Sequence, residues 1–554
     1  MPAQESAADA PRWEDVWREE TLRDWMERWA KERADHPAIR CGEVRISYGE
    51  LHRRANSLAA FLHELGLRRG DVIAAQLPNG VEFITTYLAA GYLGAALQTI
   101  HMPYRAAEIE TLLRHGGARA AICLAATKDF APAQTLLSLR ARLPALSHVI
   151  SVGGEAEGAV SFPDMADRDL PTVKRVAATE RFLLLYTSGT SAAPKAVPVP
   201  YRKYLANARL SAGELGLAGS SILMSGAPFT HLYGLFTLNL ALAVGATTAV
   251  LPSFTPELMA GALDAHRPTA LFVAPAHMAA CLNAGLLTAQ RLASLAMVQI
   301  SGSVCPQELA RAVQDRLTKG EVHQLWGMSE LQAGAFTRPG DTLERRLSSA
   351  GRASPATELR IAADTGPDGQ GELQEELQVR GASVFDGYLG DDAATAAAFT
   401  ADGWFRSGDL ATLDADGYVH ITGRVKELIN RGGIKFNLID IEAAIARHPD
   451  IAQCAIVPMP DPVLGERACC FAVPRDTASR PSLADICRFL TDQGVAKARW
   501  PEHLEIIDEM PMTPTRKVAK GKLTQRAAML HRSPTPDARS GSTSASFSRS
   551  EADR

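Results

Sequence analysis

The stretch Phe182-Leu-Leu-Leu-Tyr-Thr-Ser-Gly-Thr-Ser-Ala-Ala-Pro-Lys-Ala-Val197 decides the fold prediction. Its first five residues are apolar or aromatic and have the length and composition of a buried strand. The strand leads into a hydroxyl-rich loop that contains Gly189 and ends at Pro194 and Lys195. Small residues let backbone amides approach an anion, hydroxyls donate hydrogen bonds, and a lysine adds positive charge. These residues suit a phosphate-binding loop, and a solvated surface loop has the same composition.

The loop is not a Walker A motif, because no glycine precedes Lys195 and Ala196 follows it where that motif needs a hydroxyl. The order Tyr-Thr-Ser-Gly-Thr-Ser-x-x-Pro-Lys resembles the signature loop of the adenylate-forming superfamily. That superfamily contains the acyl-CoA synthetases, the adenylation domains of nonribosomal peptide synthesis and firefly luciferase. The resemblance implies that Lys195 is catalytic and that the loop binds ATP through Thr187, Ser188, Gly189, Thr190 and Ser191.

Composition narrows the function classes. The chain has 554 residues and is 46% hydrophobic, which predicts two or more domains. A formal net charge of -4 without a dense basic block argues against nucleic-acid binding. The eight cysteines form no metal-type CxxC pair, and the N-terminus has neither a basic start nor an apolar core. We therefore expect reduced thiols, no secretory signal and a cytoplasmic protein.

The longest uncharged apolar stretch runs from Leu232 to Phe254 and raises the alternative of a membrane span. Glycine, asparagine, threonine and proline interrupt it, which favours a buried helix followed by a buried strand. We therefore expect no transmembrane segment.

The N-terminal part alternates between strand and helix patterns. A helix is predicted from Trp13 to Ala34, a short strand from Arg45 to Tyr48, and a second helix that opens at Tyr48. A strand at Val72 to Gln76 and a helix at Phe83 to Ala96 follow. Such alternation predicts an α/β protein with mixed or parallel sheets and helices on their faces.

His231 lies in the order Pro-Phe-Thr-His-Leu-Tyr-Gly-Leu. As an isolated residue it would be a packed turn histidine. The local order, however, is similar to a motif of acyl-CoA and 4-coumarate-type ligases, which implies that His231 borders the acyl pocket. Amino-acid-activating relatives carry an aspartate in this motif and hydroxybenzoate-activating relatives an asparagine after the histidine, whereas this chain has Thr230 and Leu232. A simple aliphatic or aromatic carboxylate without an α-amino group is therefore expected.

Two further strands, Met297 to Ile300 and Val322 to Leu325, end in glycine-containing turns. Loops at the ends of neighbouring strands would line one edge of a sheet, where open α/β sheets bind ligands. An adenine ring needs a flat slot, which Trp326 and the backbone of Gly302 and Ser303 could supply.

The sequence Trp-Gly-Met-Ser-Glu330 is similar to the superfamily motif Tyr-Gly-x-Thr-Glu. Trp326 replaces the tyrosine as an aromatic face, and Ser329 replaces the threonine as a hydroxyl for the α-phosphate. The resemblance also assigns Gly327 to the nucleotide site and Glu330 to Mg²⁺, which prefers carboxylate and phosphate oxygens. Without it, Glu330 would be an ordinary surface charge.

The Asp416-Gly417 pair predicts a hairpin between strands at 410–413 and 418–422, with Asp409 just before the first strand. A carboxylate can accept hydrogen bonds from both ribose hydroxyls, and an arginine can pair with phosphate or ribose oxygens. Asp409 and Arg424 receive these roles because Trp-Phe-Arg-Ser-Gly-Asp and Gly-Arg-x-Lys resemble the superfamily's ribose and hinge motifs.

The same resemblance makes Lys426 the hinge and places Gly432 and Gly433 along a thiol channel. Asn437 is predicted as a helix N-cap, with Asp440 three residues on. Residues 451–530 read as a small α+β domain, with strands near 454–457 and 468–473 and a helix at 483–492. Relatives usually carry a proline near Leu438, a residue that stabilises a helix start and does not react.

Near the C-terminus, Pro-Met-Thr-Pro-Thr-Arg-Lys517 resembles the superfamily pattern Pro-x-Thr-x-x-Gly-Lys. The resemblance implies that Lys517 is the catalytic lysine that reaches the carboxylate and the α-phosphate. Arg516 occupies the glycine position, where a left-handed backbone would cost an arginine about 1 kcal/mol.

Together the motifs imply an ATP-dependent carboxylate–CoA ligase for a fatty, alicyclic or aromatic acid. It would use ATP, Mg²⁺ and coenzyme A, forming acyl-AMP and pyrophosphate and then a thioester. The expected organisation is a disordered segment 1–11, an N-terminal domain 12–424, a small mobile domain 425–530 and a disordered tail 531–554. We expect a monomer or homodimer.

Two alternatives stay open. One is a stand-alone ligase that loads an acyl-carrier protein. The other is a non-catalytic nucleotide-binding relative, in favour of which Arg516, Ala192 and Ala196 count.

Overall fold

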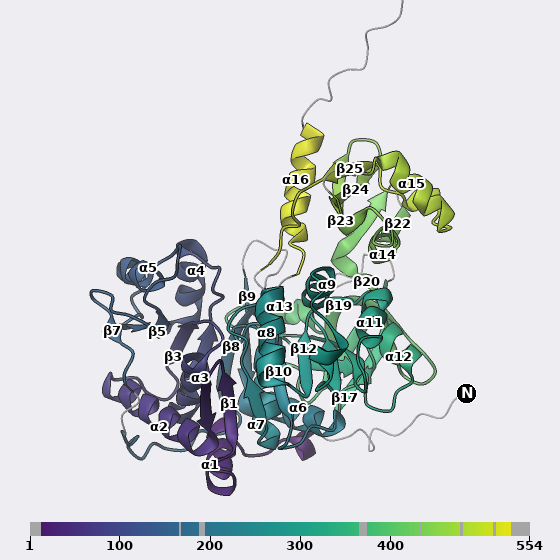
Figure 1. Ribbon diagram of the computed structural model, residues 1–554. Coiled ribbons are helices and arrows are strands. Elements are labelled where there is room, and N and C mark those ends of the chain that lie inside the picture. The colour runs from purple at the N-terminus through teal and green to yellow at the C-terminus, as the bar shows by residue number, and fades with distance from the viewer. Residues whose placement is uncertain are drawn as a thin grey trace, which may run out of the picture. The chain divides into compact units, whose positions relative to one another are not determined.

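The computed structural model describes residues 13–164, 168–187, 194–364, 374–431, 434–476, 480–513 and 517–532. The chain divides into two compact units (Figure 1). The first comprises Met1–Lys426 together with Met512–Lys517, and the second comprises Glu427–Pro511 together with Val518–Arg554. The predicted mixed α/β class is confirmed in both.

One sheet of the first unit carries the strand that precedes the hydroxyl-rich loop. Its strand order is β7 (Val160–Ser161), β6 (His148–Val152), β5 (Ala118–Leu124), β3 (Val72–Gln76), β4 (Ala96–Thr99), β8 (Arg181–Thr187) and β9 (Lys195–Pro200). Neighbouring strands are parallel except β8 and β9, which are antiparallel. The predicted bounds of β3 are confirmed.

A second sheet continues through the middle of the first unit. Its order is β16 (Arg352–Ala353), β15 (Gln332–Phe336), β14 (Glu321–Met328), β13 (Met297–Ile300), β12 (Ala270–Val273), β10 (Ile222–Ser225), β11 (Thr247–Ala249), β1 (Pro37–Cys41) and β2 (Val44–Ser47). Strands β10 to β14 are parallel where they pair, so the ends of β13 and β14 lie at one edge, as predicted. β14 runs on to Met328 because its last residues pair with β15, so the predicted end at Leu325 was too early.

A third, antiparallel sheet has the order β17 (Thr357–Asp364), β18 (Gln374–Gly381), β19 (Phe405–Leu413) and β20 (Val419–Arg424). The hairpin predicted at Asp416-Gly417 joins β19 and β20. Asp409 lies within β19 and not before it, because the ladder extends to the pair Asp409 and Arg424.

Helices of the first unit cover both faces of the sheet that contains β3 (Figure 1). Along β3, Ile73 and Ala75 join the cluster that includes α2 and α3, whereas Val72 and Ala74 join the cluster that includes α4 and α5. This alternation is the two-residue period of a strand buried on both faces. The helices are η1 (Trp13–Val16), α1 (Leu22–Glu32), α2 (Tyr48–Glu64), α3 (Val81–Leu93), α4 (Ala106–Gly116), α5 (Pro132–Leu139), η2 (Arg140–Arg142), α6 (Tyr201–Glu214), α7 (Leu232–Val244), α8 (Pro256–His266), α9 (Pro275–Asn283), α10 (Ala289–Leu292), α11 (Gln307–Gln314), α12 (Leu343–Ser348) and α13 (Asp392–Ala398).

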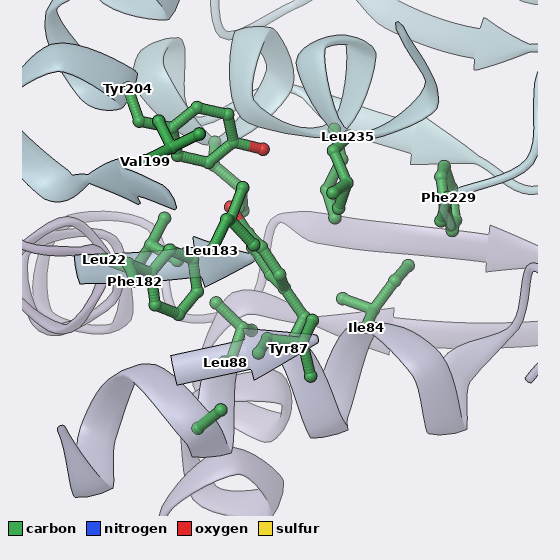
Figure 2. Packing of buried hydrophobic residues seen from close by; sticks show 14 of the residues in the cluster. Leu22, Ile84, Tyr87, Leu88, Phe182, Leu183, Val199, Tyr204, Phe229 and Leu235 are labelled. Carbon is green, nitrogen blue, oxygen red and sulfur yellow. The ribbon is translucent and has the colours of Figure 1, made fainter. Parts of the chain in front are cut away.

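The apolar half of the opening stretch forms the centre of the largest core cluster. Figure 2 shows Phe182 and Leu183 of β8 between Tyr87 and Leu88 of α3 and Tyr204 of α6. The rings of Phe182 and Tyr87 meet edge to face with centroids 5.1 Å apart. Such aromatic pairs add about 0.5–1.5 kcal/mol to the burial of their area. The loop after Thr187 therefore begins on a firmly packed strand.

The uncharged stretch that starts at Leu232 forms α7 and then β11, as predicted. Both elements are buried, and β11 pairs with β10 and β1. Within the described parts of the chain, no helix has the length and apolar character that a membrane crossing requires.

The second unit is an α+β fold. Its sheet has the order β22 (Ile434–Asn437), β21 (Leu428–Arg431), β24 (Gly465–Pro474) and β23 (Ile451–Asp461), with β25 (His503–Ile506) parallel to β24. Its helices are α14 (Ile439–Ile445), α15 (Leu483–Asp492), η4 (Lys497–Arg499) and α16 (Lys520–Arg532), and η3 (Val425–Glu427) contains the boundary between the units. The predicted helix at 483–492 is confirmed.

Two helix predictions were wrong. The long N-terminal helix is split, because Thr21 caps a new helix: the Thr21 backbone N–H and hydroxyl both donate to Asp24, at 2.8 and 2.7 Å. Asn437 ends β22 and is not an N-cap, since Leu438 occupies the N-cap position of α14 without a side-chain cap.

Candidate active site

Strands β8 and β9 fix the two ends of the hydroxyl-rich loop. Thr187 and Lys195 are direct partners in this antiparallel pair, so the loop leaves and re-enters the sheet at one point. Ser188, Gly189, Thr190 and Ser191 lie outside the described residues, as do Ala192 and Ala193.

Tyr388 connects Lys195 with Glu330. The Lys195 Nζ lies 4.6 Å from the centroid of the Tyr388 ring, and the Tyr388 hydroxyl donates to Glu330 Oε1 at 3.0 Å. The backbone supports this contact on both sides, because Phe385 N–H donates to the Glu330 carbonyl and Leu389 N–H to the Ala196 carbonyl. The sequence analysis missed Tyr388; its only signal was an aromatic residue after Gly387.

Glu330 is a buried carboxylate with 8% exposure. Burial raises its pKa above the ordinary value, while the hydrogen bond from Tyr388 and the charges of Lys195 and Arg424 act in the opposite direction. Among the described residues no three histidine, cysteine or acidic side chains form a metal-binding group. One carboxylate suits Mg²⁺ that is held chiefly by the phosphates of its nucleotide, which is the usual coordination of Mg²⁺ in such sites.

Asp409 brings β14 and the β19–β20 hairpin together. Its Oδ2 accepts from the indole Nε1 of Trp326 at 2.7 Å, and its Oδ1 accepts from Nε of Arg424 at 2.7 Å. Asp409 is 3% exposed and Trp326 is buried, so their charge-assisted bond lies away from bulk water, whereas the Arg424 side chain is 53% exposed and solvent reaches that pair. Trp326 is thus a hydrogen-bond donor to Asp409, a role that the sequence analysis did not foresee.

Two of the three glycines predicted for the nucleotide site, Gly302 and Gly327, lie in the described part of the chain, and each is required for a different reason. Gly302 has φ +97°, a conformation that disfavours other residues, and an added Cβ would lie 3.8 Å from Cε of Lys517. Gly327 is required by packing, since an added Cβ would lie 2.0 Å from the Gln332 carbonyl oxygen. Ser303 is exposed after β13, and Ser329 is half-buried beside Glu330.

Lys517 belongs to the first unit. Burial lowers its pKa to about 8; the charge of Arg424 acts in the same direction, and those of Asp409 and Glu330 raise it. Hydrogen bonds between Thr513 and Lys517 close the turn that carries it, from Thr513 N–H to the Lys517 carbonyl at 2.7 Å and from Lys517 N–H to Thr513 Oγ1 at 3.1 Å. Arg516 lies outside the described residues.

His231 is the N-cap of α7 and borders a cavity in the first unit. Its Nδ1 accepts from Tyr233 N–H at 3.2 Å. Burial holds the pKa of His231 well below its usual value, and the charges of Lys517 and His101 lower it further. The ring of His101 lies 6.3 Å from that of His231, centroid to centroid.

His101 was not among the predicted site residues. The available signal was the segment His101-Met-Pro-Tyr104, which follows β4 after one residue, and a segment after a strand end also pointed to residues 301–306.

The predicted hinge and thiol channel are described only in part. The backbone of Lys426 lies in η3, at the boundary between the units. Gly432 and Gly433 lie outside the described residues.

Comparisons with known proteins show the family of the chain. The family model of AMP-binding enzymes matches residues 26–389, and that of the AMP-binding enzyme C-terminal domain matches residues 440–517. A medium-chain fatty-acid–CoA ligase of Escherichia coli is 30% identical over 92% of this chain and 91% of its own length. A salicyl-AMP ligase / salicyl-S-ArCP synthetase of Mycobacterium tuberculosis is 33% identical over 92% of this chain and 89% of its own length.

The structure of an anthranilate CoA ligase in complex with anthranoyl-AMP has the same fold. It superposes with a TM-score of 0.84 at 24% identity, covering 94% of this chain and 100% of that one. Family models that match most of the chain, and relatives at 30% identity or more along nearly all of it, show its membership. The chain belongs to the AMP-binding enzyme family and is an adenylate-forming ligase.

Proposed function

We propose that this ligase activates a carboxylic acid with Mg-ATP, giving acyl-AMP and pyrophosphate, and then transfers the acyl group to the thiol of coenzyme A. One observation carries the proposal. The Lys517 side chain lies next to Gly302, and the charges of Glu330, Asp409 and Arg424 all act on its pKa, although these residues come from separate segments of the chain. These observations support a site in which one cation acts near both the carboxylate assigned to Mg²⁺ and the pair assigned to ribose.

The chemistry of adenylation needs positioning and charge neutralisation more than proton transfer. A substrate carboxylate oxygen forms a bond to the α-phosphorus, and the bond from that phosphorus to the bridging oxygen of pyrophosphate breaks. Two anions must approach each other, so a buried ammonium group beside them lowers the barrier. Lys517 supplies that charge, and Lys195, held over the Tyr388 ring, supplies a second one at the end of the phosphate loop.

The described carboxylates would hold the nucleotide by separate means. Asp409 is oriented by Trp326 and Arg424 and would accept hydrogen bonds from the ribose hydroxyls. Glu330, oriented by Tyr388, would hold Mg²⁺, and the metal when bound neutralises phosphate charge. The thioester step then follows from rotation of the second unit about Lys426, which would bring the segment with Gly432 and Gly433 to the thiol.

A carrier protein is the second candidate for the acceptor. It is favoured by the relative named salicyl-S-ArCP synthetase, which is 33% identical to this chain, whereas the relative named a CoA ligase is 30% identical. Both acceptors present a thiol on a pantetheine arm, so the same first half-reaction serves either one.

The test is pyrophosphate release over a panel of carboxylates, measured with and without coenzyme A, together with mass-spectrometric detection of the thioester. Catalytic turnover and an acyl-CoA product are expected with coenzyme A present. A single burst of pyrophosphate that coenzyme A does not change, with bound acyl-AMP, would favour the carrier-protein acceptor. Absence of pyrophosphate release with every carboxylate would contradict the proposed function.

A further inference from the structure

The cavity beside His231 is lined mainly by polar side chains. Its free volume is about 10 Å³, which is room for one water-sized group such as a hydroxyl or oxo oxygen. Among the described residues, three leucines form its aliphatic lining, and the other lining side chains are Thr99, His101, Tyr104, Tyr186, Thr230, His231 and Ser329. All belong to the first unit. An acyl pocket meant for a plain hydrocarbon chain would be lined by apolar side chains.

Local hydrogen bonds fix the two imidazoles of this cavity. Nδ1 of His231 accepts from a backbone N–H, so the ring proton of its neutral form lies on Nε2. Nδ1 of His101 shares a hydrogen bond of 2.8 Å with Oγ1 of Thr230, a residue that is 3% exposed. Burial lowers the pKa of His101 to about 4 and that of His231 further below its usual value. Both rings are therefore neutral at pH 7, so each can present hydrogen-bonding polarity without charge.

Within the described parts of the chain, the second ring nitrogen of each histidine has no hydrogen-bond partner. Among the described residues, Nε2 of His101 and Nε2 of His231 make no hydrogen bond, yet neither is a fully buried orphan atom. The two rings are half-buried and both line the cavity. Free polar atoms that face a cavity in this way are ready to bond a ligand.

The two ends of the cavity differ, which suggests how an acid would be oriented in it. The charge of Lys517 acts on His231, whereas only burial acts on His101. The reacting carboxylate, which needs the Lys517 charge, therefore belongs at the His231 end. The far part of the acyl group then lies toward His101 and Tyr104, whose rings meet edge to face at 5.2 Å.

We propose that His101, positioned by Thr230, is a specificity-determining residue that hydrogen-bonds a hydroxyl or oxo group on the acyl part of a compact carboxylate. This inference rests on the proposed function and narrows its substrate class. A plain alkyl or unsubstituted aryl group would cover Nε2 of His101 without bonding it. Leaving a buried polar group unpaired costs about 1–3 kcal/mol, which is a factor of about 5–150 in affinity.

The test compares matched substrates that differ by one hydroxyl. Pyrophosphate release is measured for benzoate against 2-, 3- and 4-hydroxybenzoate, and for butanoate against 3-hydroxybutanoate. The enzymes are wild type, His101→Phe, His101→Gln and the control His63→Phe at the half-exposed end of α2. Binding of the corresponding acyl-sulfamoyl adenosines, measured by calorimetry, gives a readout that does not depend on turnover.

In the wild type we expect at least one hydroxylated acid to exceed its parent in kcat/KM by about 10–100-fold. His101→Phe should reduce that ratio to within about threefold of unity, mainly through the KM of the hydroxylated acid. His101→Gln should restore part of the ratio, and His63→Phe should leave it unchanged.

Two results would overturn the inference while leaving the proposed function intact. One is a wild-type preference for the unsubstituted acids. The other is an equal loss for both members of a pair in His101→Phe, which would reveal a structural role. If no carboxylate releases pyrophosphate, the proposed function itself fails and this inference fails with it.

Discussion

The two ends of the candidate site in the first unit differ in how their polar groups are satisfied. At the nucleotide end, Asp409 is bonded by Trp326 and Arg424, and Glu330 by Tyr388. At the proposed acyl end, His101 and His231 are neutral and both line the cavity. Every nucleotide substrate is the same, so its proposed site can be oriented in advance by internal pairs. In the proposed function, the ring nitrogens at the acyl end would bind the group that distinguishes one acid from another.

The largest expected effect comes from removing the charge that lies between these ends. Lys517→Ala should slow acyl-adenylate formation by about 10²–10³-fold or more, because a preorganised cation at two converging anions is lost. The same variant should still convert supplied acyl-adenylate to thioester. In that step the thiol attacks the acyl carbon, so no anion has to approach the α-phosphate. Single-turnover measurement of each half-reaction tests both statements.

The counterpart variant is Gly433→Leu, which should keep adenylation and impair thioester formation. Equal loss of both half-reactions in Lys517→Ala and Gly433→Leu would rule out alternation of the two units. Full adenylation activity in Lys517→Ala would show that the catalytic charge is elsewhere.

The second-largest effect is expected from the substitution Asp409→Ala. It removes the carboxylate that would bind ribose and leaves Arg424 and Trp326 without this partner. Charge-assisted hydrogen bonds contribute about 1.5–3 kcal/mol, so the KM for ATP should rise by roughly 10–100-fold. The KM for the carboxylate should stay near the wild-type value, because Asp409 does not line the acyl cavity. An unchanged affinity for ATP would remove the ribose assignment.

Sequence patterns predicted most elements that carry the site. Three elements have the predicted bounds: the strands Val72–Gln76 and Met297–Ile300, which are short and buried throughout, and the amphipathic helix Leu483–Asp492. Sequence patterns predicted the wrong bounds where a capping side chain or a partner strand determines the end of a helix or strand. Thr21 and Asp24 begin α1, and pairing with β15 extends β14 through Trp326.

Side-chain contacts between distant segments could not be predicted from the sequence. Motif positions singled out Glu330, Asp409, His231 and Lys517 one by one. Nothing in their spacing predicted that Tyr388 would join Glu330 to Lys195, or that His101 would lie beside His231, since such contacts depend on the fold.

The pH dependence should separate the two ends. The pKa of Lys517 is lowered to about 8, so this group loses its charge as pH rises through that value. For adenylation, kcat/KM should fall above pH 8 by about tenfold per pH unit, because it reports the free enzyme. Lys517→Arg keeps its charge and should move this decline to higher pH. In the folding equilibrium the lowered pKa has the opposite consequence, since burying the charged form costs stability below pH 8 and this cost is relieved above it.

The acyl end should not titrate in the same range. The pKa of His101 is about 4 and that of His231 is well below its usual value, so both rings stay neutral from pH 5 upward. The preference for 3-hydroxybutanoate over butanoate should therefore stay constant from pH 6 to 9 while the overall rate changes, because an aliphatic hydroxyl does not ionise in this range. A preference that varies over this range would contradict the neutral pair.

Glu330→Gln tests the carboxylate assigned to Mg²⁺. The amide keeps the size of the side chain and an acceptor for the Tyr388 hydroxyl but loses the charge. The magnesium concentration for half-maximal adenylation should rise by roughly tenfold. Tyr388→Phe is the matched control for orientation without loss of charge, and it should shift the requirement less. Equal shifts in the two variants would mean that Glu330 acts through its contact with Tyr388 and not through its charge.

The smallest expected effect concerns Trp326, which has two separable properties. Its ring was predicted to face adenine, and its indole N–H donates to Asp409 at 2.7 Å. Trp326→Phe keeps an aromatic face and removes the donor, so Asp409 would be held by Arg424 alone. The KM for ATP should then rise by about 3–10-fold, the value of one net hydrogen bond. In the Asp409→Ala background the same substitution should have almost no further effect, because the bond is already absent. Additive effects in this double-mutant cycle would show that Trp326 acts through its ring face, and the paired carboxylate at the nucleotide end would then not depend on the indole.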